Sequence, residues 1–590
     1  MSTLIRTLIH SLLRTTLAWM LGALLAAGAA AQGWSPKTVE LFESLPVQDG
    51  GRVKPTSTYA NFLLLRLSGK TSLKLEDGTS LSHTQWLLDV MFQPEKAAGY
   101  PVFLVPDSDV LDAIGVGHEG KKKRDRYSLN DLKPGVMKLF ELAQEYSRRE
   151  AKLRSSLEQN VVTLAENINE YGGITGRMQL ASIPPDVSIE QDPAWHSPEE
   201  LFSRQRAGET LPAAHAAMLE DYLELAKRRD KSAEFEQQLE KIHGATLRLA
   251  DARGEYDKIP LEIRYYDLGL IHWSLYTFLL SFVLVAFTWL FGRSRALYAG
   301  AISLAAIATV LLSIAIAMRC VIRDRPPVST LYETVIFITA VGCLVGLFAE
   351  WVQRNRLAVS ATAILGVVGV FIANGYETLD KRDTMPSLVA VLDTNFWLAT
   401  HVTAITIGYA AGLFAAILAS IFLLSKLFQI SRKDKSYYTS LTRMTYGVLC
   451  FGVIFSTVGT ILGGIWANDS WGRFWGWDPK ENGALLIVLS QLVILHLRMG
   501  GHVRDFGIAM LAAFGGIIVA FSWWGVNLLG VGLHSYGFTS GISTALNTYY
   551  IVQAGIMVLG AIGHLIELSR QQSQVPETVS FASDGQGSAS

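Results

Sequence analysis

Hydrophobic residues gather into long runs in the second half of this chain. From about residue 268 onward, nine apolar stretches follow one another, at 268–291, 296–318, 331–350, 357–373, 396–425, 441–465, 482–498, 506–526 and 546–567. Each is close to the ~20 residues that an α-helix needs to cross the hydrocarbon of a bilayer. Because helices satisfy their own backbone groups in lipid, the pattern predicts nine membrane-spanning helices.

The region before these runs is polar and of mixed charge. Apolar residues recur there at helical spacing near 136–171 and 211–249, and joints rich in Pro and Gly interrupt them. We therefore expect a mainly helical soluble domain over 32–264. Its basic run at 121–124 is short and soon meets acidic residues, which favours a solvated loop over a binding patch.

The first residues form a separate segment. Arg6 and Arg14 precede an apolar, Ala-rich stretch at 17–31, a pattern typical of a signal peptide that could equally remain as an anchor. Either alternative would carry the following domain across the membrane. The expected division of the chain is a signal peptide or anchor at 1–31, the soluble domain at 32–264, a transmembrane domain at 265–570 and a disordered cytoplasmic tail at 571–590.

Composition agrees with an all-α polytopic membrane protein. Half of the 590 residues are hydrophobic and only 17% are charged, which is too apolar for a soluble protein of this length. The net charge of −1 gives no basic surface for nucleic acid. Three widely spaced cysteines, Cys320, Cys343 and Cys450, form neither a disulfide framework nor a CxxC motif. We expect them to serve packing.

The distribution of Lys and Arg predicts the orientation. Basic residues are more numerous in the connections at 292–295, 351–356, 426–443 and 498–504 than in the alternate connections, and such residues accumulate on the cytoplasmic side. The soluble domain and the alternate connections are then outside. We expect a multi-pass protein of a bacterial cytoplasmic membrane, with its soluble domain in the periplasm.

One outer connection, at 466–481, is unusually rich in Trp. It contains Trp466, Trp471, Phe474, Trp475 and Trp477, interleaved with glycines and charged residues. An interfacial aromatic belt explains scattered Trp, but not this interleaving within one tight loop. The alternative is a platform for a large flat ligand, with glycines permitting close backbone approach. Haem fits, because a porphyrin offers apolar faces and an iron for which imidazole is a usual ligand.

Three histidines are candidates for binding that iron. His401 lies at the outer start of its apolar stretch, and His534 lies in the outer connection 527–545. Either alone is typical of a capping or interfacial histidine, but together around the Trp-rich segment they predict two ligands on opposite faces of one iron. His496 lies near the inner end of its stretch and indicates either a deeper haem site or a side chain that reaches the inner surface.

An outer basic cluster opposes the positive-inside trend. Arg319, Arg323 and Arg325 lie close together in the sequence, and guanidinium groups bind carboxylates by paired, charge-assisted hydrogen bonds. They would suit the haem propionates. The alternative is a loop whose arginines form salt bridges with Asp324 and Glu333.

These motifs together resemble a known family. The pattern Trp471-Gly472-x-x-Trp475-x-Trp477-Asp478-x-Lys480-Glu481, with His401 before it and His496 and His534 after it, resembles the tryptophan-rich signature of the CcsA (ResC) cytochrome c synthase subunits. That family belongs to a haem-handling superfamily with CcmC and CcmF. The resemblance covers roughly 265–570.

The resemblance implies a function and a set of site residues. His401 and His534 would be axial ligands of haem b at the outer site, and His496 would bind haem entering within the membrane. Trp471, Trp475, Trp477 and Asp478 would form the site of attachment. Members of the family act as holocytochrome c synthases, which join haem by thioether bonds to the CxxCH motif of apocytochrome c at the outer face of the lipid bilayer.

The resemblance also implies a partner. In this family the second intramembrane histidine belongs to a ResB/CcsB-like membrane subunit, and no such multi-helix module is recognisable in this sequence. His272, His564 and His10 are poor candidates for that second histidine, because of their expected depth in the membrane. Two competing functions stay open: a secondary transporter, which commonly shows internal repeats and broken helices, and a haem exporter. The absence of a GxxxxGK[ST] sequence argues against ATP-driven export by this chain itself.

Overall fold

The computed structural model describes residues 33–75, 77–186, 194–291, 294–388, 394–430, 434–532 and 542–572. The chain divides into two compact units, one of Met1–Asp49 and Val53–Asp257, the other of Gly50–Arg52 and Lys258–Ser590. The predicted signal or anchor segment and residues 573–590 of the predicted tail lie outside the described residues.

The first unit is built from helices and three short strand pairs, β1–β2, β3–β4 and β5–β6, of which the last two are antiparallel. Its helices are α2 (Pro36–Glu43), α3 (Thr56–Ser68), α4 (His83–Phe92), α5 (Pro94–Ala97), α6 (Asp109–Ile114), α7 (Leu129–Leu132), α8 (Val136–Ser147), α9 (Ser156–Arg177), α10 (Pro198–Arg206), α11 (Ala213–Lys227) and α12 (Ser232–Asp251). Its strands are β1 (Pro46–Asp49), β2 (Arg52–Pro55), β3 (Ser72–Lys74), β4 (Ser80–Ser82), β5 (Phe103–Val105) and β6 (Asp125–Tyr127).

Local sequence explains where several of these helices begin. Ser82, Ser128 and Ser155 each form a capping box with the residue three positions later, which satisfies amide groups that a helix start leaves unpaired. A continuous apolar core holds the helices together around aromatic side chains such as Trp86 and Phe235. The unit therefore has the core of a water-soluble domain.

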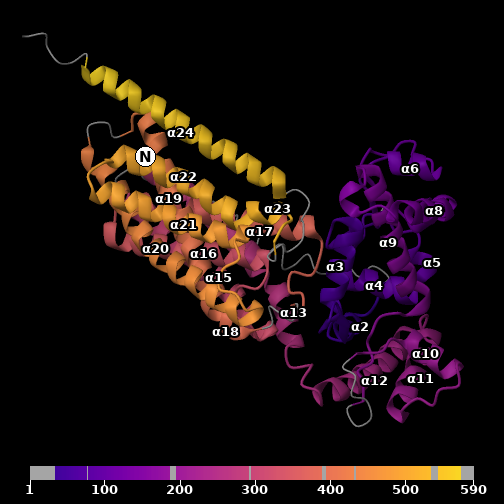
Figure 1. The fold of residues 1–590 in the computed structure, drawn as a ribbon. Coiled ribbons are helices and arrows are strands. Elements are labelled where there is room, and N and C mark those ends of the chain that lie inside the picture. The colour runs from indigo at the N-terminus through magenta and orange to yellow at the C-terminus, as the bar shows by residue number, and fades with distance from the viewer. Residues whose placement is uncertain are drawn as a thin grey trace, which may run out of the picture. The chain divides into compact units, whose positions relative to one another are not determined.

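The second unit is a bundle of long helices (Figure 1). Its elements are α13 (Ile259–Leu268), α14 (Leu270–Leu290), α15 (Arg295–Arg323), α16 (Leu331–Gln353), α17 (Leu357–Asp380), α18 (Asn395–Trp397), α19 (Thr403–Leu427), α20 (Lys435–Trp471), α21 (Pro479–Met499), α22 (Asp505–Ala520), α23 (Val526–Leu528) and α24 (Ile542–Gln572). Two short π-helical turns, Leu398–Val402 and Phe521–Gly525, continue α18 into α19 and α22 into α23.

Nine spans within the described residues are long and apolar enough to cross a membrane, so the predicted all-α polytopic architecture is confirmed. The most apolar parts of α17 and α19 are 67% buried inside the protein, whereas that of α24 is only 17% buried. Figure 1 accordingly shows α24 as a long helix along the outside of the bundle, next to α22. The centre of the bundle is thus formed around α17 and α19.

The Trp-rich segment is not one loop, as the sequence interpretation had it. α20 continues through Trp466 and ends only at Trp471. Hydropathy marks the point where a chain leaves apolar surroundings, but the helix continues as long as its hydrogen bonds can form. The polar residues after 465 therefore extend a helix that had been expected to end there.

Candidate functional site

The end of α20 and the backbone after it have distinctive conformations. α20 stops because Gly472 adopts the left-handed conformation, with φ of +70°, and donates its N–H to the carbonyl of Asn468. Trp477 has φ of +58°, a conformation that a bulky residue rarely adopts. Such a residue persists only where its surroundings determine the backbone.

Two carboxylates fix this connection to the start of α21. Glu481 accepts hydrogen bonds from the N–H of Gly476 at 2.7 Å and of Asp478 at 3.1 Å. Asp478 accepts from the N–H of Lys480 at 2.9 Å, and Asp478 and Glu481 together form the capping box of α21. The guanidinium of Arg473 covers Gly476, where an added Cβ would overlap it. The connection between α20 and α21 is therefore stabilised by hydrogen bonds among its own residues and the first turn of α21.

The segment is also attached to neighbouring helices. Lys480 donates through Nζ to the carbonyl oxygen of Trp523 at 2.6 Å, and the indole N–H of Trp523 donates to Oγ1 of Thr334 at 3.2 Å. Gly483 lies so close to Ser522 that an added Cβ would sit 3.0 Å from the serine Cβ. These contacts join the Trp-rich segment to the second π-helical turn and to α16.

Aromatic rings remain exposed on this segment. Trp477 is 71% exposed and Phe474 is 49% exposed, and the Phe474 ring lies over Gly464 of α20. The rings of Trp475 and Trp477 are nearly perpendicular, with centroids 6.3 Å apart, while the Arg473 guanidinium lies 5.9 Å from the ring of Trp471. The segment therefore offers apolar aromatic surface that the bundle itself does not bury.

His401 lies in the first π-helical turn and packs against α20. Its Nδ1 is 2.7 Å from the carbonyl oxygen of Gly459. A carbonyl oxygen only accepts, so Nδ1 carries the proton and the neutral ring has its lone pair on Nε2. The ring also covers Gly463, where an added Cβ would lie 2.5 Å from Cε1. Single π-helical turns occur frequently at functional sites.

Aromatic contacts link His401 to the Trp-rich segment. The His401 ring centroid lies 5.7 Å from that of Trp466, and Trp466 stacks on Trp397 with centroids 6.3 Å apart and planes at 13°. Trp466 and Trp471 lie on the same terminal part of α20. The structure thus places His401 beside the start of the Trp-rich segment.

His534 lies outside the described residues. The described part of its connection ends at Gly532, which lies against the cap of α21. A Cβ added at Gly532 would come within 2.0 Å of Oδ2 of Asp478. This connection therefore reaches the Trp-rich segment two residues before His534 in the sequence.

The remaining histidines have different surroundings. His496 is exposed near the end of α21 and its Nδ1 is 2.8 Å from the carbonyl of Leu492, one turn earlier. His564 stacks on Phe506 with centroids 4.1 Å apart, and His272 is exposed on α14. His496 and His272 are thus both exposed, on α21 and α14 respectively.

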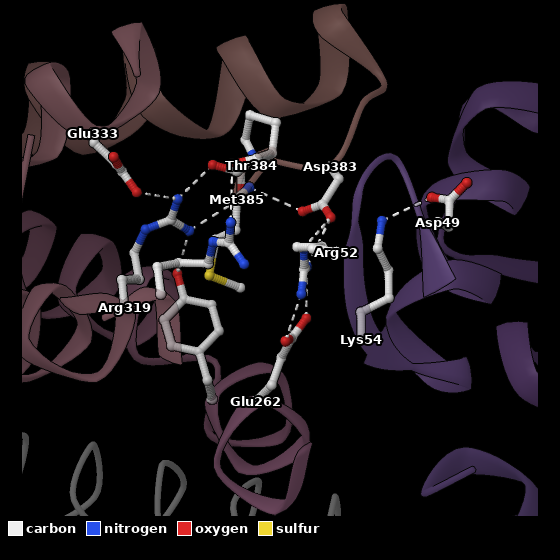
Figure 2. Close-up of polar contacts among 12 residues, drawn as sticks. Asp49, Arg52, Lys54, Glu262, Arg319, Glu333, Asp383, Thr384 and Met385 are labelled. Carbon is white, nitrogen blue, oxygen red and sulfur yellow. Dashed lines mark hydrogen bonds and ion pairs between the residues drawn. The ribbon is translucent and has the colours of Figure 1, made fainter. Parts of the chain in front are cut away.

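Arg319 is buried in a dense set of contacts (Figure 2). It is 2% exposed and donates to Glu333 at 3.0 Å, to Oγ1 and O of Thr384 at 3.1 and 2.5 Å, and to the hydroxyl of Tyr265 at 3.3 Å. Its four terminal N–H groups thus have partners within the protein. Asp324 instead pairs with Lys258 at 3.2 Å.

Arg323 and Arg325 are less fully bonded. Nη1 of Arg325 donates to the carbonyl of Pro386 at 3.0 Å and Nη2 of Arg323 to the same oxygen at 3.4 Å. Nε of both residues and Nη2 of Arg325 are buried without a hydrogen-bond partner, although Glu333 lies 4.0 Å from that Nη2. Burial lowers the pKa of Arg325, an effect that Glu333 offsets only in part. These donors are able to receive a further acceptor.

Sequence reasoning missed two features near this site. The first is the contact of Lys480 with Trp523, since nothing local indicates a bond across 43 positions. The second is Arg52, whose guanidinium binds Glu262, 210 positions later in the chain, and Asp383, 331 positions later. An Arg in a turn-rich segment gave no signal for either contact.

The described second unit is therefore that of a multi-pass membrane protein that gathers a histidine and exposed aromatic rings at one end of its bundle. A family model described as cytochrome C assembly protein matches residues 328–534. The cytochrome c biogenesis protein CcsA of Cucumis sativus is 31% identical over 253 residues, 36% of this chain and 77% of that protein. This chain belongs to the CcsA family of cytochrome c biogenesis proteins.

Other relatives differ in coverage. CcsA of Chlamydomonas reinhardtii is 34% identical over 225 residues, which are 36% of this chain and 61% of that protein. Protein NrfI of Wolinella succinogenes is 26% identical over 507 residues, which are 82% of this chain but only 53% of NrfI. A solved structure titled cytochrome c heme lyase CcmF covers 50% of each chain at 16% identity and a TM-score of 0.36, a similarity too low to compare helix positions.

Proposed function

We propose that this protein binds haem b between His401 and His534 at the outer face of a bacterial cytoplasmic membrane and presents it for covalent attachment to apocytochrome c. The tautomer of His401 carries the proposal. Because Nδ1 donates to the Gly459 carbonyl, Nε2 keeps the lone pair that a haem iron requires. Membership of a cytochrome c biogenesis family supports the same substrate.

The exposed rings supply the proposed platform. Trp477 and Phe474 present apolar area that a porphyrin face would cover. Gly532 against Asp478 supports His534 as the second ligand, because it brings that connection to the same segment. Of the three arginines, Arg323 and Arg325 retain unpaired donors for a propionate, whereas the terminal donors of Arg319 are engaged.

The proposed reaction is addition of each CxxCH thiol to a haem vinyl group. The sulfur bonds to one vinyl carbon and the thiol hydrogen goes to the other, so the step needs no oxidant, and the iron is kept reduced. The protein's contribution is to place the thiols beside the vinyl carbons, which removes much of the entropic barrier. A fixed iron position between two imidazoles serves that purpose.

A ResB/CcsB-like membrane subunit is the proposed partner. His496 is exposed on the outside of the bundle, and an intramembrane imidazole there suits a haem shared with another protein. The positive-inside pattern supports an exported first unit and an inner position for His496. Haem would then pass from His496 to His401.

The absorption spectrum of the detergent-purified protein tests the proposal. We expect a haem band whose intensity per protein falls strongly in His401→Ala and His534→Ala, because each substitution removes one axial ligand. His272→Ala is the matched control, since that histidine is exposed on α14. An unchanged haem band in the double variant His401→Ala/His534→Ala, at normal protein level, would refute the proposal.

Co-expression with a CxxCH apocytochrome separates this function from a haem exporter or secondary transporter. A synthase yields haem that stays with the apocytochrome after denaturation, and we expect this product only when a ResB-like subunit is present. Haem found free outside the membrane, without covalent product, would favour export instead.

A further inference from the structure

Four arginines hold the short segment 383–386, which lies between α17 and the helix of His401. Arg52 binds the side chain of Asp383, and Arg319 binds the side chain and carbonyl of Thr384. Arg323 and Arg325 share the carbonyl of Pro386. Four acceptor atoms of this segment thus meet a guanidinium.

Arg52 differs from the other three arginines in bonding to the carboxylates of both Glu262 and Asp383. It belongs to the second unit together with Gly50 and Gly51 and is 5% exposed. Nη1 and Nη2 each lie 2.8 Å from an oxygen of Glu262, while Nε and Nη2 lie 3.0 and 2.7 Å from Oδ2 of Asp383. Burial opposes the charge, yet Asp383 and Glu262 raise the pKa of Arg52. One guanidinium therefore joins α13 to the segment.

The other oxygen of Asp383 shapes the segment itself. Oδ1 accepts the backbone N–H of Met385 at 2.9 Å, and Met385 is fully buried. Gly51 approaches so closely that an added Cβ would lie 3.2 Å from Oγ of Ser387. The aspartate is thereby bound on both sides, by Arg52 and by the turn that it closes.

The segment is connected to the proposed haem ligand. The next described residues after 388 are Thr394 and Asn395, and the Asn395 amide donates to the carbonyl of Asp324 at 3.0 Å. α18 and the π-helical turn with His401 follow directly. The carbonyl of Pro386 and the start of the helix of His401 are therefore bound by neighbouring residues at the end of α15, Arg323 and Arg325 on one hand and Asp324 on the other.

We propose that Arg52 is a positioning residue for His401. Its bond to Asp383 fixes the start of the segment that leads into the histidine's helix, and its bond to Glu262 fixes Arg52 in turn. The inference rests on His401 as a haem ligand. It assigns a role to the turn at Gly50–Arg52, for which the sequence indicated none.

Hydrogen–deuterium exchange and haem spectra of purified Arg52→Gln and Arg52→Lys test the role. We expect faster exchange in peptides covering 381–402, several-fold less haem per protein, and a shift of the remaining haem from six-coordinate to five-coordinate spectra. Arg52→Lys should have a smaller effect than Arg52→Gln, because an ammonium group keeps the positive charge but does not reproduce the paired hydrogen bonds of a guanidinium.

Lys54→Gln is the matched control, since Lys54 is also buried and pairs with a carboxylate, Asp49, at 2.7 Å. It should leave exchange at 381–402 and the haem spectrum unchanged. If Arg52→Gln lowers only the amount of protein, with normal haem ratio, spectrum and exchange in what remains, the positioning role is wrong. Loss of haem in His401→Ala but not in Arg52→Gln would reject this inference alone; no dependence on His401 would instead reject the proposed function.

Discussion

Individual residues of the Trp-rich segment divide into those that face outward and those that hold the backbone. Trp477 and Phe474 keep much of their surface exposed, whereas Asp478 and Glu481 are committed to backbone amides. Asp478 is 6% exposed and caps α21. Helix capping is thus one role that the structure gives to its position in the motif.

Substitutions of Asp478 should separate capping from charge. Asn caps helices about as well as Asp, while Ala at an N-cap costs about 0.5–2 kcal/mol of stability. We expect Asp478→Asn to retain the thermal unfolding midpoint and haem content of the unmodified protein in detergent, and Asp478→Ala to lower both. An Asn variant as poor as Ala would show that the negative charge itself is needed.

At the scale of elements, close approach of α19 and α20 determines the surroundings of His401. Gly459 lies so near Ile405 that an added Cβ would be 2.6 Å from its backbone nitrogen, and Gly463 faces the His401 ring. Small residues permit such approach between membrane helices. The hydrogen bond from Nδ1 to the Gly459 carbonyl exists only because the two helices meet without intervening side chains.

Gly463→Ala should therefore displace the His401 ring. A methyl group would lie 2.5 Å from Cε1, so the imidazole must move, and we expect reduced haem content with a changed ligation spectrum. Gly447→Ala in the same helix is the control, because no atom lies within 4 Å of the added Cβ. In a helix interior, Ala is more favourable than Gly by about 1 kcal/mol. Equal haem spectra for the two variants would contradict this account of how Gly463 and the His401 ring pack.

Considered as a whole, the chain combines two units suited to different solvents. The first unit buries an apolar core and exposes few large hydrophobic side chains, Met137 among them. The second exposes many along its long helices, including Val558 of α24. Such surface is stable where lipid replaces water.

A charge placed on each surface should reveal which solvent it faces. An Asp near the middle of a membrane helix costs about 2.5–3.5 kcal/mol of insertion free energy. We expect Val558→Asp to reduce the protein recovered from membranes, whereas Met137→Asp, at a residue 75% exposed, should leave recovery unchanged. The measurement is the amount of each variant in the membrane fraction. Equal recovery of both variants would argue against lipid around α24.

The sequence by itself determined the class of fold and supplied the residues of the candidate site as a prediction. Nine spans follow from apolar runs, because lipid leaves a helix few alternatives, and His401 beside the Trp-rich segment followed from their shared level in the membrane. Residues such as Asp478 were recognisable because the motif that they form is continuous in the chain.

Only the tertiary structure decided what each polar side chain contacts. Helix α20 extends to Trp471 because a helix continues for as long as its backbone hydrogen bonds form, whatever the hydropathy of its residues. Arg319 binds Glu333 and Thr384, and Arg52 reaches Asp383 across 331 positions, since buried charges must find partners wherever the fold brings them. The sequence offered Glu333 as one of two alternatives for the arginines, but it gave no sign of the contacts with Thr384 and Asp383, because packing between distant segments creates them.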